Sequence, residues 1–176
     1  MNRPADARAA IAEAVKADGT LPGPHDVEGQ LLERENKPAE ARAAYEQAVA
    51  AGSMSFYTYY RLAALMWTPS AGAADYEKIE ELSTHATSLN DAYAPAQDLL
   101  GNIRVRLRKP GAAVAPSTRA IELRPDQPAQ RLTLAEALFQ LGEKAQALKM
   151  AQLALAVSRT DDERRRAQAA IDRYSK

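Results

Sequence analysis

The segment that decides the fold is residues 134–155, which read LAEALFQLGEKAQALKMAQLAL. Its apolar residues return at helical spacing on both sides of Gly142, so the segment predicts two helices joined by a short turn. In the second of these helices, Ala147 and Ala154 lie two turns apart. An equally spaced pair occurs upstream, at Ala113 and Ala120. The segment is therefore one copy of a repeated unit.

Five stretches of the chain carry this pattern. The first position is held by Ala7, Ala41, Ile79, Ala113 and Ala147, and the second by Ala14, Ala48, Ala86, Ala120 and Ala154. The spacing of the copies is constant except for one longer step, from Ala41 to Ile79, whose extra residues fall in the loop 68–72. A further series with the same spacing is Gly29, Ala63, Gly101 and Ala135. A fixed period of about 34 residues predicts a stack of similar helical hairpins, with small residues where the helices cross closely.

The pattern Leu100-Gly101…Ala113…Ala120-Ile121…Pro125 resembles the tetratricopeptide repeat, and the copy that begins at Leu134 does so too. The resemblance covers nearly the whole chain. It implies an all-α, right-handed superhelical solenoid of helix-turn-helix repeats with a C-terminal capping helix. We expect one domain of residues 1–176 with about ten helices. Its expected parts are the second helix of a truncated repeat (1–21), four repeats (22–55, 56–93, 94–127 and 128–161) and the cap (162–176).

Three local features depart from the repeat. The signature Trp of the first helix is replaced, in successive units, by His25, Tyr59, Gln97 and Arg131. Arg104 stands where other units carry Leu or Met, and we expect its stem to pack while the guanidinium reaches water, with a buried ion pair as the alternative. Pro116 lies two turns past Pro110, so we expect the helix of residues 113–123 to kink or to start late.

The two ends of the array also differ. Residues 160–163 predict a capped helix start with an acidic first turn, and one apolar stripe follows on that helix. At the other end, Ile11 and Val15 lie one period before Tyr45 and Val49, so they belong to a second helix without its first helix. We expect this N-terminal edge to expose an apolar strip that either pairs copies of the chain or leaves its helix frayed.

The composition argues against most other kinds of function. The chain has 23 basic and 23 acidic residues, no Cys and two His residues. A neutral balance disfavours nucleic-acid binding, and no apolar run is long enough to insert in a membrane. His25 and Glu28 share a helix face, but a metal site needs at least three ligands. No phosphate loop and no converging carboxylates are visible, so we expect no enzyme activity, no cofactor and no metal.

The resemblance implies that the first helices of successive units line an inner groove. The residues of these helices that packing does not use are typical interface anchors, rich in Tyr, Trp and Arg. The candidate protein-binding residues are Tyr57, Tyr60, Arg61, Ala64, Trp67, Asp98, Asn102, Arg106, Thr133, Glu136, Phe139 and Gln140. The alternative is that Tyr60 and Trp67 are covered by the loop 69–72 or pack between repeats.

The sequence therefore predicts a non-catalytic protein–protein interaction module that binds a peptide or helical segment of a partner in the concave groove. Some members of the family clamp a terminal carboxylate there, but of the corresponding positions only Arg61 fits in charge. The alternative function is that of a structural or accessory C-terminal repeat domain of a larger protein, such as an enzyme, which mediates positioning or self-association.

Overall fold

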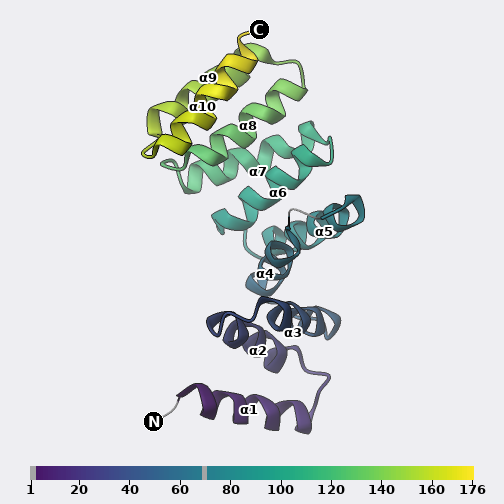
Figure 1. Ribbon diagram of the computed structural model, residues 1–176. Helices are drawn as coiled ribbons and strands as arrows, with labels where there is room; N and C mark the ends of the chain where they lie inside the picture. The colour runs from purple at the N-terminus through teal and green to yellow at the C-terminus, as the bar shows by residue number, and fades with distance from the viewer. Residues whose placement is uncertain (1–2, 69–70) are drawn as a thin grey trace. The chain divides into compact units, whose positions relative to one another are not determined.

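The computed structural model describes residues 3–68 and 71–176, and all secondary structure in these ranges is helical (Figure 1). The chain divides into two compact units, Met1–Asn90 and Asp91–Lys176, called here the N-terminal unit and the C-terminal unit. The N-terminal unit contains α1 (Arg3–Ala17), α2 (Pro22–Arg34), α3 (Pro38–Ala50), α4 (Phe56–Met66) and α5 (Ala73–Leu89). The C-terminal unit contains α6 (Ala94–Arg106), α7 (Pro110–Leu123), α8 (Pro128–Gln140), α9 (Lys144–Val157) and α10 (Asp161–Tyr174).

The helix ends follow from local residue chemistry. Proline stands in the first turn of α2, α3, α6, α7 and α8, where the missing N–H costs no hydrogen bond. Gly52 and Gly142 follow the ends of α3 and α8 with φ of 80° and 84°, a conformation that glycine adopts without strain. Thr160 caps α10 in a reciprocal pair with Glu163, which confirms the capped start predicted for this helix.

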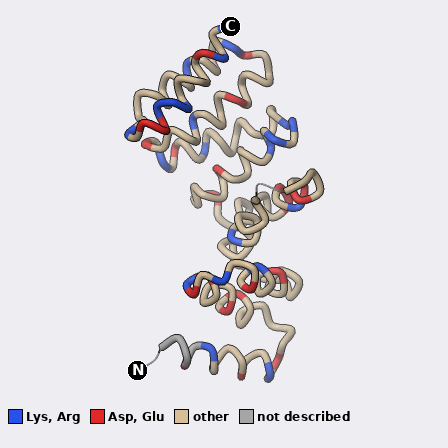
Figure 2. The backbone as a smooth tube through the Cα atoms, viewed as in Figure 1, with Lys and Arg blue, Asp and Glu red and all other residues tan. Residues whose placement is uncertain are grey.

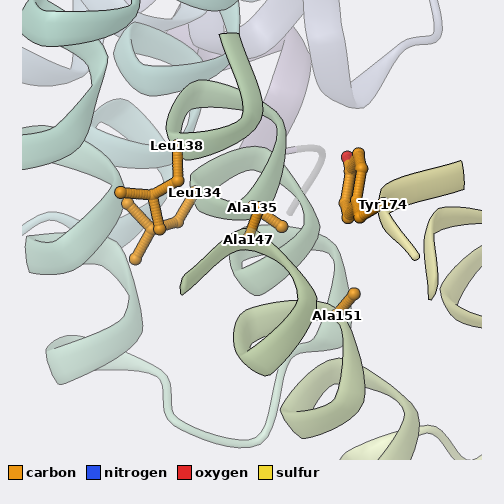
Figure 3. Close-up of a cluster of buried hydrophobic side chains, with 6 residues drawn as sticks. All are labelled: Leu134, Ala135, Leu138, Ala147, Ala151 and Tyr174. Atoms are coloured by element: carbon orange, nitrogen blue, oxygen red, sulfur yellow. The ribbon is translucent and has the colours of Figure 1, made fainter. Parts of the chain in front are cut away.

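The periodic small residues form the core of each hairpin. In units that the structure describes fully, both repeated positions are completely buried, from Ala41 and Ala48 in α3 to Ala147 and Ala154 in α9. In the last hairpin, α10 closes this core with Tyr174, which packs with side chains of α8 and α9 (Figure 3). The close-up draws Leu134, Ala135, Leu138, Ala147, Ala151 and Tyr174. The repeating pattern therefore records which residues lie between packed helices.

Polar side chains take over the position of the signature Trp by reaching back to the preceding turn. The ring of His25 places Nε2 3.3 Å from the carbonyl oxygen of Gly19. Gln97 donates to the carbonyl of Asp91 at 3.1 Å, and Arg131 donates to that of Pro125. The two partners of each contact have the same separation in sequence. Three repeats therefore use the same contact between side chain and backbone to hold the segment that precedes their first helix.

Arg104 and Pro116 form a pair that the sequence did not reveal. The helix α7 begins at Pro110 and runs through Pro116, so the expectation that it starts late is wrong, and the kink expected as the other outcome stays a prediction. Because proline has no N–H, Pro116 cannot bond to the carbonyl of Ala112, one turn earlier. Arg104 of α6 donates its Nη1 to this carbonyl oxygen at 3.0 Å. A guanidinium from the neighbouring helix thus replaces the lost backbone donor.

We expect Arg104→Leu to lower the free energy of unfolding by about 0.5–1.5 kcal/mol, because it removes this replacement donor. In a Pro116→Ala background, Arg104→Leu should lower the free energy of unfolding clearly less, because residue 116 then supplies its own N–H. Urea unfolding of the four proteins of this cycle measures the coupling. Equal losses in the two backgrounds would show that Arg104 does not serve the proline.

Candidate binding surfaces

The C-terminal unit contains a cleft of about 610 Å³ between α6, α8 and α10. Four of the predicted groove residues line it together: Asn102 and Arg106 of α6, with Thr133 and Glu136 of α8. The remaining lining residues are Val105, Gln127, Pro128, Ala129, Leu132, Thr160, Asp162, Glu163 and Arg166. The cleft therefore combines apolar side chains of the parallel helices α6 and α8 with polar side chains that come largely from α10.

The sequence pattern does not predict the contribution of α10, because it indicates only that this helix caps the array. The spacing of the helices nevertheless indicates this contribution. The helix α8 begins at Pro128 and α10 begins at Asp161, a separation close to the period of the repeat. The helix α10 therefore takes the place of the first helix of a further unit. A helix in that place faces the cleft as well as the core, which explains why Thr160, Asp162 and Arg166 line the cleft.

The carboxylates of the cleft are already bound by groups of the same chain. Glu136 accepts hydrogen bonds from Arg173 at 2.7 Å and from the Tyr174 hydroxyl at 2.9 Å. Burial would raise the pKa of Glu136, but hydrogen bonds from Gln140, Tyr174 and Arg173 together hold it below its ordinary value. Asp162 pairs with Arg166 at 2.6 Å. Glu136 is therefore ionised at neutral pH, and both carboxylates have a cationic partner within the chain.

The other predicted residues of this unit do not line the cleft. Phe139 packs against Tyr174, with ring centroids 4.7 Å apart, and the Arg173 guanidinium lies 4.8 Å from the Phe139 ring centroid. Gln140 donates to Glu136 at 3.0 Å. Both residues thus help to seat α10. Asp98 of α6 is half-buried, and burial raises its pKa although Arg124 opposes the shift.

The raised pKa of Asp98 predicts a pH dependence of stability. A carboxyl whose pKa is raised by folding stabilises the folded state below its unfolded value, about 3.8, and this contribution is lost as the pH rises through the folded value. Asp98→Asn removes the buried charge, so the variant should have a higher urea midpoint than the wild type at neutral pH. The advantage should shrink as the solution is acidified towards the unfolded value. If the variant is less stable than the wild type at every pH, the Asp98 carboxylate stabilises the folded state.

In the N-terminal unit, the predicted aromatic residues of α4 lie around an ion pair. Tyr57 and Tyr60 have ring centroids 6.4 Å apart, and the Arg61 guanidinium lies 5.7 Å from the Tyr60 centroid. Arg61 donates Nε to Glu33 of α2 at 2.7 Å, and the buried Tyr45 donates its hydroxyl to the same carboxylate at 2.8 Å. Hydrogen bonding to Glu33 raises the pKa of Arg61, which keeps this cation charged. Glu33 of α2 therefore links Tyr45 of α3 and Arg61 of α4 within this unit.

Trp67 and Ala64 have separate surroundings. The Trp67 ring lies 6.3 Å from that of Tyr76 on α5, so it packs against the second helix of its own hairpin. Ala64 is half-buried on α4. Residues 69–70, which belong to the loop named as a cover for this tryptophan, lie outside the described residues. This contact lies within one repeat, so cover by the loop and packing between repeats both stay predictions for Trp67.

A second cleft, of about 720 Å³, lies between α1, α2 and α3. Ile11 and Val15 of α1 line it and are half-buried, whereas Tyr45, the counterpart of Ile11 one period later, is fully buried. Arg8 pairs with Glu35 at its rim. The packing of α1 is therefore looser than that of the later second helices, and self-association through this edge stays a prediction.

Metal-binding clusters and membrane-spanning helices are both absent from the described part of the chain. No group of three metal-binding side chains lies close together there. None of the described helices is long and apolar enough to cross a membrane.

The similarity of the chain to known proteins lies in its structure. No protein-family model and no curated protein matches the sequence. YrrB, described as a tetratricopeptide-repeat protein with an unusual peptide-binding site, matches with a TM-score of 0.77 and 16% identity, over 96% of this chain and 84% of that chain. TTC0263 of Thermus thermophilus, described as a thermophilic protein of this kind, matches with a TM-score of 0.61 and 22% identity, over 92% of this chain and 87% of that chain.

A third similar structure contains a ligand. The second tetratricopeptide-repeat domain of human RPAP3, in complex with an HSP70 peptide, has a TM-score of 0.54 and 18% identity, over 58% of this chain and 83% of that domain. The prediction of an all-α helical repeat solenoid is confirmed. The repeat period, the paired helices and these matches together show that the chain has the fold of tetratricopeptide-repeat proteins.

Proposed function

We propose that the chain is a non-catalytic module that binds a peptide or helical segment of a partner protein, and that the cleft between α6, α8 and α10 holds part of this segment. The observation that carries the proposal is the lining of that cleft. It combines an apolar floor, from Val105 and Leu132, with the amide of Asn102 and the hydroxyl of Thr133. Such a surface offers apolar contact and hydrogen bonds to a peptide backbone.

The N-terminal unit offers a second kind of contact. Tyr57 and Tyr60 are half-buried on α4 and present rings that can stack on a bound side chain. Arg61 supports the Tyr60 ring while it pairs with Glu33. We infer that Tyr57 and Tyr60 bind ligand directly, whereas Arg61 positions them. The peptide-binding site described for YrrB and the peptide bound to RPAP3 support this class of ligand.

The proposal is tested with peptides selected from a random display library against the wild-type chain. Thr133→Trp fills the cleft and should weaken the selected peptides at least tenfold, or about 1.4 kcal/mol. Thr118→Trp is the matched control, because Thr118 is exposed on α7 and does not line the cleft. The proposal fails if both variants bind equally well, or if no peptide is selected while the protein is folded.

A further inference from the structure

His25 of α2 carries a buried ring nitrogen that has no hydrogen-bond partner. The side chain is only 9% exposed, and its Nε2 lies 3.3 Å from the carbonyl oxygen of Gly19. A carbonyl oxygen can only accept, so this contact assigns the ring proton to Nε2 and leaves a lone pair on Nδ1. Nδ1 has no hydrogen-bond partner among the described residues. A buried acceptor in this state costs free energy, so a donor that reached Nδ1 would gain a hydrogen bond.

Glu28 lies beside this nitrogen but does not satisfy it. Its Oε2 is 3.6 Å from Nδ1 of His25, which is longer than a hydrogen bond. A carboxylate and the lone pair of a ring nitrogen are both acceptors, so neither donates to the other. The Glu28 side chain is 40% exposed, and it can therefore turn into water and leave Nδ1 open. The missing group is a donor.

The next hairpin shows what fills the corresponding space. Tyr59 holds the position of His25 in α4, and its ring packs on the His85 ring of α5 with centroids 4.1 Å apart. Gln47 holds the position of His85 in α3, because each of the two stands one residue before the repeated alanine of its helix. Two rings therefore meet between α4 and α5, whereas a smaller ring and an amide side chain take their places in α2 and α3.

Between α2 and α3 this space is open. His25 and Gln47 line the cleft of about 720 Å³ described above, and they also line a neighbouring hollow of about 620 Å³. The cleft has apolar surface as well, which comes from Ile11, Val15, Leu31 and Leu32. An apolar cleft with one unsatisfied polar atom is typical of a site for a small molecule.

The charges around the cleft balance one another. Positions of both signs lie on α1, α2 and α3 (Figure 2). The charged side chains of the cleft and its rim are three basic, Arg8, Lys16 and Lys37, and three acidic, Glu28, Glu35 and Glu40. Arg8 and Lys37 both contact Glu35. Since neither sign is in excess, the cleft favours a neutral ligand over an ion.

We propose that this cleft binds a small, neutral aromatic molecule that carries one N–H or O–H donor, as indole and phenol do. The ring lies between His25 and Gln47, in the place where two rings of the next hairpin meet, and its donor bonds to Nδ1 of His25. A free molecule is the occupant because Nδ1 is buried. A peptide backbone attached to the ring would bring unpaired polar groups into the cleft. This site belongs to the N-terminal unit and does not depend on the peptide proposed for the C-terminal unit.

Nuclear magnetic resonance of the histidine rings in the full chain tests the proposal. The sequence contains two His residues, so His85 is an internal control for His25. In ¹⁵N-labelled protein at pH 8, indole should shift the Nδ1 resonance of His25 and leave the His85 ring unchanged. Benzofuran has nearly the same shape as indole, with an oxygen in place of the N–H. It should bind about two- to tenfold more weakly, because it has no hydrogen to donate.

Three variants separate the hydrogen bond from the shape of the cleft. His25→Phe keeps a ring but removes the acceptor, so it should bind indole and benzofuran equally. Gln47→Trp fills the space from α3 and should abolish the binding of both. Glu46→Trp is the matched control, because Glu46 is exposed on α3 and lines neither hollow, and it should bind like the wild type. Circular dichroism checks that each variant is folded.

Four outcomes overturn the proposal. If no His25 resonance shifts up to the solubility limit of indole, the cleft is not a site for such molecules. Equal affinities of the wild type for indole and benzofuran would leave only an apolar hollow. Protons on both ring nitrogens of His25 in the free protein would show that Glu28 already pairs with Nδ1. Tighter binding of a capped Gly-Trp-Gly peptide than of indole would assign the cleft to a side chain of a partner protein.

Discussion

Gly29→Ala is expected to lower the free energy of unfolding by about 1–3 kcal/mol, because it overpacks the crossing of α2 and α3. A Cβ at this position would lie 2.3 Å from Cε1 and 2.5 Å from Cδ1 of Tyr45. The Tyr45 ring is fully buried and its hydroxyl is bonded to Glu33, so it has no room to move aside. Urea unfolding followed by circular dichroism measures the effect.

Gly23→Ala is the matched control for this prediction. Gly23 lies in the same helix, and a Cβ added there would meet no atom within 4 Å beyond its two chain neighbours, Pro22 and Pro24. The substitution should change stability by less than about 1 kcal/mol, because the smaller loss of conformational freedom of alanine is opposed by crowding between its Cβ and the Pro24 ring. If the two variants change stability in the same direction and by similar amounts, the close approach of Tyr45 to Gly29 is not the cause of the change at Gly29.

Glu136→Ala is expected to lower the free energy of unfolding by about 1.5–3 kcal/mol and to loosen α10. The change removes the acceptor for Arg173, for the Tyr174 hydroxyl and for Gln140. Tyr174 is buried, so its hydroxyl would be left without this partner inside the last core. Hydrogen exchange of the α10 amides should accelerate more than that of α6, because α6 does not contribute to this cluster of bonds.

The same carboxylate predicts how stability depends on pH. A group whose pKa is lowered by folding stabilises the folded state above its unfolded value, about 4.5, and this contribution is lost as the pH falls through the folded value. Glu136→Gln should therefore differ from the wild type most at neutral pH and least in acid, below the folded value. A constant difference between the two proteins over this range would show that the charge of Glu136 is not involved.

The helices were the most predictable part of this protein. The repeated alanines, the prolines of the first turns and the glycines at the helix ends are local signals, and local signals specify where a helix begins and ends. The error at α7 has a physical reason of the same kind. Proline does disrupt a helix locally, but Arg104 from the neighbouring helix compensates for Pro116, and a sequence window around residue 116 does not contain Arg104.

The candidate site was less predictable than the fold. The sequence places Asn102, Arg106, Thr133 and Glu136 on a shared surface, and these residues do line one cleft. It groups Phe139 with them because that residue lies at the same helical spacing, yet Tyr174 and Arg173 cover its ring. Periodicity identifies the face of a helix, but it does not say whether a later helix packs on that face.

The sequence by itself determined the repeated hairpins, because the period and the residue-specific helix ends are encoded within each copy. Only the tertiary structure decided which charged groups form ion pairs within the chain. Arg61 meets Glu33 across 28 residues and Arg173 meets Glu136 across 37, so both pairs exist only when helices from different repeats pack together. The physical reason is that an ion pair needs contact between side chains, and contact between repeats depends on how each helix is seated on its neighbours.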